Sequence, residues 1–256
     1  MCKGDRPPLR EDEQLVEVNE HLRLIEKKNG LRFGTDAFLL SAFCRTRSSA
    51  RAVELGTGSG IVSLLLAARR KYAHVTAVEV QAELAALAAR NVDLNGFSRT
   101  VSVLSLDVRE LSSRTLGGEV EAVLSNPPYM KEDSGYASPH DVKQAARHEQ
   151  HGDIRDFAAA AARCLKYGGV FYTVYRPDRL DSLFTALRGA NFACKRMLFV
   201  HDSPDKAPSM VLTEAKLGAA EGLTVLPPLF LHDTPNRGLP RPLSARAEEV
   251  YRTGEC

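Results

Sequence analysis

Residues 53–61 read VELGTGSGI, and this stretch decides the fold. An apolar, β-prone segment runs into three glycines spaced two apart, and a helical pattern of apolar residues begins directly after them, at Ile61, Leu64, Leu65 and Ala68. A strand, a glycine turn and a helix in this order are typical of a doubly wound α/β domain. In such a domain backbone N–H groups and a helix N-terminus face a nucleotide-like ligand.

The spacing of Gly56, Gly58 and Gly60 excludes the dinucleotide-binding fingerprint. That fingerprint needs Gly-x-Gly-x-x-Gly, and counting from Gly56 its third glycine falls on Ile61, which disfavours a nicotinamide oxidoreductase. With Glu54 before it, the motif instead resembles the first motif of class I S-adenosylmethionine methyltransferases. A tight turn that binds no ligand is the alternative interpretation.

A second stretch, AVLSNPPY at residues 122–129, is an apolar strand that ends in Asn-Pro-Pro-Tyr. Two successive prolines fix φ and move Asn126 out of helical space, so the backbone is rigid where the strand ends. This arrangement aims the amide of Asn126 and the ring of Tyr129. A plain turn is the alternative for this motif alone, but its position after the glycine motif favours a functional site.

The composition fits one globular domain, since the chain has 256 residues, of which 44% are hydrophobic and 26% charged. We find neither an 18-residue apolar run nor a charged, apolar leader, so we expect a cytoplasmic protein that does not enter a membrane. The five cysteines lack Cys-x-x-Cys spacing, and we therefore expect neither a metal site nor a disulfide framework.

A net charge of +2 supplies no strong overall field, so a nucleic-acid substrate would need local basic patches. Basic clusters lie within residues 45–51, 69–71 and 237–246. We expect them to be solvated surface, and they are the first places to look for phosphate contacts.

Strands and helices alternate along the chain, which predicts a parallel sheet. The expected strands are residues 74–79, 101–106, 122–125, 170–175, 196–201 and 209–216, in addition to the one before the glycines. The expected helices are residues 37–43, 61–68, 81–95, 153–165, 178–190 and 245–251. The last two strands have no helix between them and should pair antiparallel. The fold class is therefore α/β and Rossmann-like, with a mostly parallel seven-stranded sheet, one antiparallel edge strand and helices on both faces.

The domain organisation follows from the same patterns. Residues 1–14 are predicted to be a mobile tail, residues 15–216 the main domain, and residues 217–256 a proline-rich extension packed on it. Residues 22–33 alternate around Asn29-Gly30, which predicts a β-hairpin. Thr35 or Asp36 is expected to cap the helix that follows.

Three acids are expected at the carboxyl ends of the first strands, where such sheets bind ligands. Glu79 lies 19 residues after Gly60 and is placed to accept hydrogen bonds from ribose hydroxyls. Asp107 would accept from the adenine amine of the cofactor, and Glu54 would lie near the ammonium of its methionine part. A solvated strand-end acid is the alternative for Asp107 and Glu79.

Asn126 and the residues after it would act on the substrate. An exocyclic amine is a poor nucleophile, because its lone pair is delocalised into the ring. The side-chain oxygen of Asn126 and the backbone carbonyl of Pro127 are acceptors for its two N–H groups, and Tyr129 can stack on the base. Such contacts strengthen as positive charge grows on nitrogen, so they stabilise the transition state.

Three motifs in this order carry a closer resemblance: FGTDA at residues 33–37, NPPY at 126–129 and ARHE at 146–149. They are similar to the bacterial tRNA(Val) adenine-N6-methyltransferase family, and the similarity extends over about residues 20–252. The resemblance implies S-adenosylmethionine as cofactor and, as substrate, the N6 amine of the adenosine 3′ to the anticodon of tRNA(Val). We also expect a monomer.

The resemblance also implies further site residues. Thr35 and Asp36 would border the cofactor, together with Glu54, the three glycines, Glu79 and Asp107. Pro128, Arg147 and His148 would lie beside the substrate. All of these positions are candidates for mutation.

Other interpretations remain open. Release-factor glutamine methyltransferases share the Asn-Pro-Pro-Tyr motif, but resemble chains with a helical domain ahead of the core, whereas only about 35 residues precede it here. Guanine methyltransferases of ribosomal RNA often carry a duplicated half, which is absent from this sequence. A non-catalytic S-adenosylmethionine-binding module would have no need of Asn126 and Tyr129.

Overall fold

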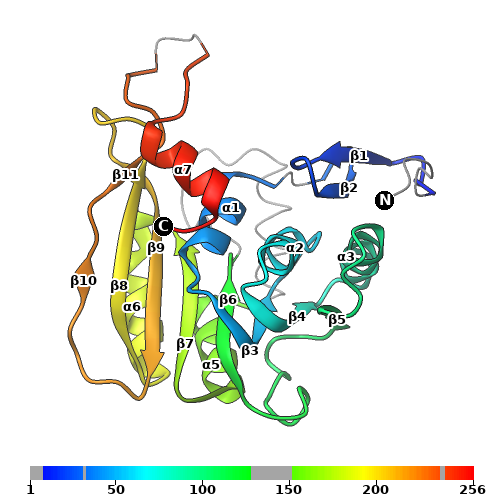
Figure 1. Ribbon diagram of the computed structural model, residues 1–256. Coiled ribbons are helices and arrows are strands. Elements are labelled where there is room, and N and C mark those ends of the chain that lie inside the picture. The colour runs from blue at the N-terminus through cyan, green and yellow to red at the C-terminus, as the bar shows by residue number, and fades with distance from the viewer. Residues whose placement is uncertain (1–7, 31–32, 128–151, 237–239) are drawn as a thin grey trace, which may run out of the picture.

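The computed structural model describes residues 8–30, 33–127, 152–236 and 240–256. Across them a nine-stranded sheet has helices on both faces, and a separate two-stranded hairpin precedes it (Figure 1). The strands are β1 Glu13–Glu17, β2 Arg23–Lys27, β3 Arg47–Leu55, β4 Tyr72–Glu79, β5 Val101–Ser105, β6 Val120–Ser125, β7 Leu165–Tyr175, β8 Phe192–His201, β9 Pro208–Leu217, β10 Thr224–Val225 and β11 Leu229–Phe230. The helices are α1 Thr35–Phe43, α2 Ile61–Ala68, α3 Ala82–Leu94, α5 Ile154–Cys164, α6 Leu180–Gly189 and α7 Ala245–Thr253, with a 3-10 turn at Pro177–Arg179.

The sheet confirms the predicted Rossmann-like α/β class. Strands β7, β6, β3, β4 and β5 are neighbours in this order and all parallel. Strand β9 is antiparallel to both of its neighbours, β7 and β8. The predicted position of the antiparallel strand at the edge is wrong, because the β8–β9 hairpin folds β9 back between β7 and β8. The two short strands β10 and β11 then pair with β8 in parallel, so the sheet has nine strands across the described residues and the predicted number of seven is wrong.

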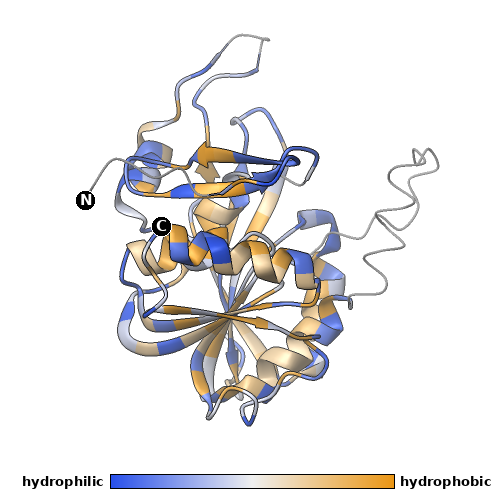
Figure 2. Cartoon of the chain, turned by 90° about the vertical axis from the view of Figure 1, so that its right-hand side faces the viewer, coloured by the Kyte–Doolittle hydropathy of each residue, from blue (hydrophilic) through white to orange (hydrophobic). Residues whose placement is uncertain are grey.

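Two apolar cores lie on opposite faces of the sheet. Helices α1, α2, α3 and α7 cover one face, and α5 and α6 cover the other (Figure 1). Strand β6 is buried at five of its six residues, as expected for a central parallel strand with helices on both sides. Figure 2 shows the strands from the side, fanned out between the helices. No helix of the described segments is long and apolar enough to cross a membrane.

The N-terminal hairpin differs from its prediction. Strand β2 pairs antiparallel with β1, which precedes it and was not predicted. Residues 31–32 lie outside the described part of the chain. Strand β1 begins at Glu13, one residue before the predicted end of the tail, because Glu13 is only 3% exposed and its carboxylate forms an ion pair with Arg90 at 2.7 Å.

The C-terminal helix α7 packs on α1, the helix that opens near the predicted site. The rings of Tyr251 and Phe38 lie 5.2 Å apart. Apolar residues of α1 and of α7 belong to the same core. The position of α1 therefore depends on the last residues of the chain.

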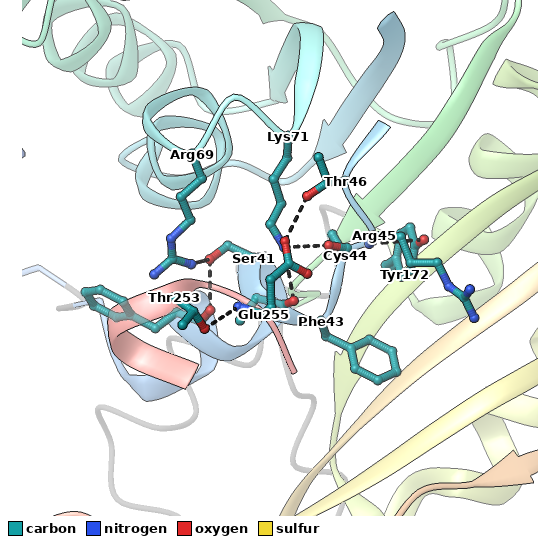
Figure 3. A network of polar contacts seen from close by, with 12 residues as sticks. Ser41, Phe43, Cys44, Arg45, Thr46, Arg69, Lys71, Tyr172, Thr253 and Glu255 are labelled. Atoms are coloured by element: carbon teal, nitrogen blue, oxygen red, sulfur yellow. Dashed lines mark hydrogen bonds and ion pairs between the residues drawn. The ribbon is translucent and has the colours of Figure 1, made fainter. Parts of the chain in front are cut away.

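The buried Lys71 connects α1 to the C-terminal end of the chain, as Figure 3 shows. Lys71 is 1% exposed and its Nζ donates to the carbonyl oxygens of Ala42 and Cys44, at 3.1 and 2.6 Å, and lies 3.3 Å from the carboxylate of Glu255. Arg69 donates to the hydroxyl of Ser41 and also reaches α7. Burial lowers the pKa of both basic groups. The prediction of solvated surface is therefore wrong for Lys71, whereas Arg70 is exposed and Arg69 is half-buried.

Candidate functional site

One rung of the sheet brings the predicted motifs together. Leu55, at the end of β3, is in register with Val78 of β4 and with Ser125 of β6. The hydroxyl of Ser125 also donates to the carbonyl oxygen of Leu55 at 2.9 Å. The next residues on these three strands begin the glycine turn, supply the predicted ribose acid and begin the Asn-Pro-Pro motif. All three therefore leave the sheet side by side at its carboxyl edge, where α/β sheets bind ligands.

The glycine turn between β3 and α2 is open toward solvent at its middle. Gly56, Gly58 and Gly60 have φ values of 70°, 57° and 88°, in the left-handed region that favours glycine. A Cβ atom built at Gly58 would meet no atom within 4 Å. Because this backbone is bare and is followed by the N-terminus of α2, the turn fits a cofactor that approaches the main chain closely.

Glu79, at the end of the neighbouring strand β4, forms a hydrogen bond to the glycine turn. The side chain is 5% exposed; its Oε2 accepts the N–H of Gly58 at 2.9 Å and its Oε1 accepts the N–H of Gln81 at 3.0 Å. An ionised carboxylate has about four lone-pair sites, so these bonds leave it capacity for further donors. Its predicted contact with ribose hydroxyls stays a prediction.

Glu54 lies beneath the turn and is only 2% exposed. Its Oε2 accepts from the hydroxyl of Thr57 at 2.6 Å, from the N–H of Ser63 at 3.0 Å and also from the Ser63 hydroxyl. Burial raises the pKa of this carboxyl to about 7, against the lowering effect of these donors. Glu54 thus links the turn to the first turn of α2, and its predicted contact with an ammonium group stays a prediction.

Asp107 follows β5 and forms a local ion pair. The guanidinium of Arg109 lies against it, with Nε donating to Oδ1 at 3.0 Å, and the backbone N–H of Arg109 donates to the same oxygen at 2.8 Å. The adenine contact predicted for Asp107 therefore requires its carboxylate to serve Arg109 and the ligand together.

Helix α1 begins beside Asn126. Its N-cap is Gly34 and no side chain caps it, so the capping predicted for Thr35 or Asp36 is wrong. Asp36 lies instead in the first turn, where its Oδ1 accepts a backbone N–H at 2.9 Å and its Oδ2 accepts from Nδ2 of Asn126 at 2.7 Å. Pro127, the next residue, is buried. The structure thus places Asp36 against the amide of Asn126, and the contact of Asp36 with the cofactor stays a prediction.

A pocket of about 200 Å³ opens next to this pair. Its walls come from the first turn of α1, the end of β7 and the beginning of β9. The lining residues are Thr35, Asp36, Tyr175, Arg176, Ser209 and Met210. Sequence reasoning named only the first two for the site, because the others lie far from them along the chain.

Four predicted residues lie outside the described part of the chain: Pro128, Tyr129, Arg147 and His148. The structure says nothing of their positions. In the part that it does describe, no group of three or more His, Cys, Asp or Glu side chains is arranged to hold a metal ion.

Asn91 is a residue of the site that sequence reasoning missed. It is fully buried in α3; its Nδ2 donates to the carbonyl oxygen of Ser59, in the glycine turn, at 2.9 Å. The same amide exchanges two hydrogen bonds with the backbone of Ile25 in β2, at 2.7 and 3.0 Å. The only signal in the sequence is an asparagine on the apolar side of an amphipathic helix.

The fold and site define a class: proteins with the Rossmann-like methyltransferase fold. The structure is similar to a crystal structure of a predicted O-methyltransferase from Agrobacterium tumefaciens, with a TM-score of 0.69 and 24% identity, covering 87% of this chain and 98% of that one. It is also similar to TYW2 from M. jannaschii in complex with AdoMet, with a TM-score of 0.56 and 14% identity, covering 83% of this chain and 89% of that one. At these identities the likeness shows the fold alone.

The sequence comparisons define a narrower group than the fold does. The family model for the methyltransferase small domain matches residues 28–183, and the chain belongs to this family. A curated tRNA1(Val) (adenine(37)-N6)-methyltransferase from Phocaeicola vulgatus is 30% identical over 73% of this chain and 77% of its own length. A protein of the same name from Tolumonas auensis is 28% identical over 86% of this chain and 90% of its own length. The chain is thus a methyltransferase, which confirms the enzyme class predicted from its motifs.

Proposed function

We propose that this protein transfers a methyl group from S-adenosylmethionine to the N6 amine of adenosine 37 in tRNA(Val). The observation that carries the proposal is the rung Val78–Leu55–Ser125, which puts the glycine turn and Asn126 on adjacent strands. A cofactor on the turn and a base at Asn126 would then be neighbours. The names of the relatives supply the choice of tRNA and adenosine.

The residues present fit the cofactor. The bare backbone at Gly58 admits a ligand that a Cβ would obstruct, and Glu79 presents a carboxylate at the same edge. When bound, the cofactor would supply a methyl group from its sulfonium, whose sulfur leaves as a neutral thioether, and the methylated nitrogen would then release one proton to water. The chain therefore needs no strong base, and its task is to align the two reactants.

The substrate amine would lie at Asn126, over the pocket beside α1. The Oδ1 atom of Asn126 and the carbonyl oxygen of Pro127 accept its two N–H groups and favour a pyramidal nitrogen whose lone pair points away from the ring. Because nitrogen becomes positive during transfer, both contacts are stronger in the transition state than in the ground state. The pocket walled by Asp36 and Tyr175 supplies space for a base taken out of its stack.

The proposal includes the cytoplasmic location and the monomeric state expected from the sequence. The test is methyl transfer from radiolabelled S-adenosylmethionine to bulk tRNA, followed by analysis of the nucleosides. The expected product is N6-methyladenosine. Label on release factor or on ribosomal RNA, with tRNA unlabelled, would contradict the choice of substrate. Cofactor binding without any transfer would contradict the catalytic role.

A further inference from the structure

Asp36 and Asn126 are 90 positions apart in the chain and meet at the site. The Nδ2 atom of Asn126 donates to Oδ2 of Asp36 at 2.7 Å. The other carboxylate oxygen, Oδ1, accepts the N–H of Ala37 at 2.9 Å, which also donates to the carbonyl oxygen of Gly34 at 3.2 Å. Each oxygen of Asp36 thus has its own donor, and the carboxylate is held in one orientation.

This contact decides which end of the Asn126 amide faces which way. A primary amide has a donor end and an acceptor end of nearly equal size, so the surrounding groups alone select its orientation. An ionised carboxylate only accepts, so it selects the NH₂ end of Asn126. The Oδ1 atom is then directed away from Asp36. The reversed amide would point a donor at a substrate amine that itself carries only N–H donors.

We propose that Asp36 is a positioning residue, which holds Asn126 with its acceptor end toward the methylated amine. This inference rests on the proposed function. Asp36 also lines the pocket beside Asn126, so the residue that orients the amide forms a wall of the space for the base. Its position in the first turn of α1 suits a negative charge, which the helix dipole stabilises there.

The Asp36→Asn substitution keeps the shape and removes the exclusive acceptor. If the new side chain keeps its bond to Ala37 through Oδ1, its NH₂ faces Asn126, which must then turn its own oxygen toward residue 36. The turned Asn126 presents NH₂ to the substrate. We expect the single-turnover rate at saturating S-adenosylmethionine and tRNA to fall about 100-fold. The affinity for S-adenosylmethionine should remain within about twofold, and the melting temperature should stay close to that of the wild type.

The exchange of the two side chains is the decisive variant. Asn126→Asp alone sets two carboxylates against each other and should also be slow. In the double variant Asp36→Asn, Asn126→Asp, the amide of residue 36 donates to one oxygen of residue 126, and the other oxygen again accepts from the substrate. We expect the double variant to be at least about 10-fold faster than either single variant. Asp93→Asn, in which an exposed carboxylate that accepts from Ser98 is changed in the same way, serves as the matched control and should keep the wild-type rate.

Three results would overturn the inference: a wild-type rate in Asp36→Asn, a rate loss matched by an equal loss of S-adenosylmethionine affinity, or a folded double variant without recovery. NMR detects the contact between Asp36 and Asn126 without turnover, so the contact can be tested separately from the proposed function. In ¹⁵N-labelled protein, the side-chain amide signals of Asn126, assigned with Asn126→Ala, should shift in Asp36→Asn and not in Asp93→Asn. Unchanged signals would contradict the contact itself, whereas a wild-type enzyme that methylates no tRNA would contradict only the proposed function.

Discussion

The cofactor side and the substrate side of the site lie on neighbouring strands, but the chain holds them in different ways. The proposed cofactor side consists of Glu54, the glycine turn and Glu79, and the two carboxylates bind residues at most 21 positions away, while Asn91 binds the turn from 32 positions beyond Ser59. The substrate side consists of Asp36, Asn126, Pro127 and the adjoining pocket. Its central bond spans 90 positions, and its pocket also takes residues from β9.

The comparison shows two ways of pre-organising a ligand site. On the proposed cofactor side, the carboxylates of Glu54 and Glu79 bind backbone N–H groups and hydroxyls within two consecutive strand–helix units, so most of this half is built from one continuous segment of the chain. On the substrate side, the amide of Asn126 is oriented by a helix whose place depends on α7 and on the buried Lys71. Substitutions should therefore separate cofactor affinity from transfer rate.

Asn126→Ala should have the largest effect. Because it removes an acceptor that acts in the transition state, we expect the transfer rate to fall by about 10²–10³-fold or more, with little change in S-adenosylmethionine affinity. Single-turnover methylation and equilibrium titration of the cofactor measure the two quantities. Asn95→Ala, which removes an amide that bonds to the backbone of β2 away from the site, is the control. A loss of cofactor affinity in Asn126→Ala would contradict the division into two sides.

Glu79→Ala should do the reverse. It leaves the N–H groups of Gly58 and Gln81 without their acceptor and removes the predicted ribose contact. A hydrogen bond to a charged group contributes about 2 kcal/mol, so we expect S-adenosylmethionine to bind about 30-fold more weakly. The transfer rate at saturating cofactor should change much less. Titration that shows unchanged affinity would exclude the ribose role.

Gly58→Ala tests the bare backbone of the turn, with Gly96→Ala as a matched control. Both residues have positive φ, 57° and 72°, and a Cβ at either would meet no atom within 4 Å. Each substitution should therefore lower the free energy of unfolding by about 1 kcal/mol through the same backbone strain. Only Gly58→Ala should also weaken S-adenosylmethionine binding. Equal cofactor affinity in the two variants would show that the ligand does not approach Gly58.

The smallest effect concerns Glu54 and pH. Burial raises the pKa of this carboxyl to about 7 from its ordinary value of 4.5, so the folded state binds more protons than the unfolded chain between these pH values. The contribution of Glu54 to stability is therefore fully present below pH 4.5 and is lost as the pH rises through 7. In Glu54→Gln, the free energy of unfolding should fall less steeply with pH in this window, by about 1 kcal/mol per pH unit. Parallel pH profiles from denaturant titrations of the two proteins would contradict this assignment.

The same difference explains what the sequence predicted and what it missed. The alternation of strands and helices predicts a parallel sheet, so the class of the fold could be predicted from the sequence. The glycine spacing and Glu79 are local signals, and they were enough to predict which edge of the sheet holds the motifs. The place of β9 inside the sheet is a matter of long-range pairing, which local periodicity does not contain. Strand β1 was missed for a similar reason, because its charged Glu13 is buried against Arg90 of α3, which is far away in the sequence.

The substrate side shows the limit most clearly. The motif around Asn126 marked the position, but nothing in the sequence indicated that Asp36 would contact its amide, or that Ser209 and Met210 would wall the adjoining pocket. The same holds for Lys71, whose basic neighbours suggested solvated surface. Its burial follows from the way in which α7 and Glu255 close over α1.

The most direct test of the account uses two tRNA(Val) transcripts, one with adenosine at position 37 and one with guanosine there and no other change. The wild-type protein is incubated with each and with labelled S-adenosylmethionine, and the methylated nucleoside is identified and mapped by mass spectrometry. We predict one N6-methyladenosine, at position 37 of the first transcript, and no methylation of the second. Equal methylation of both transcripts, or methylation of neither, would contradict the central claim.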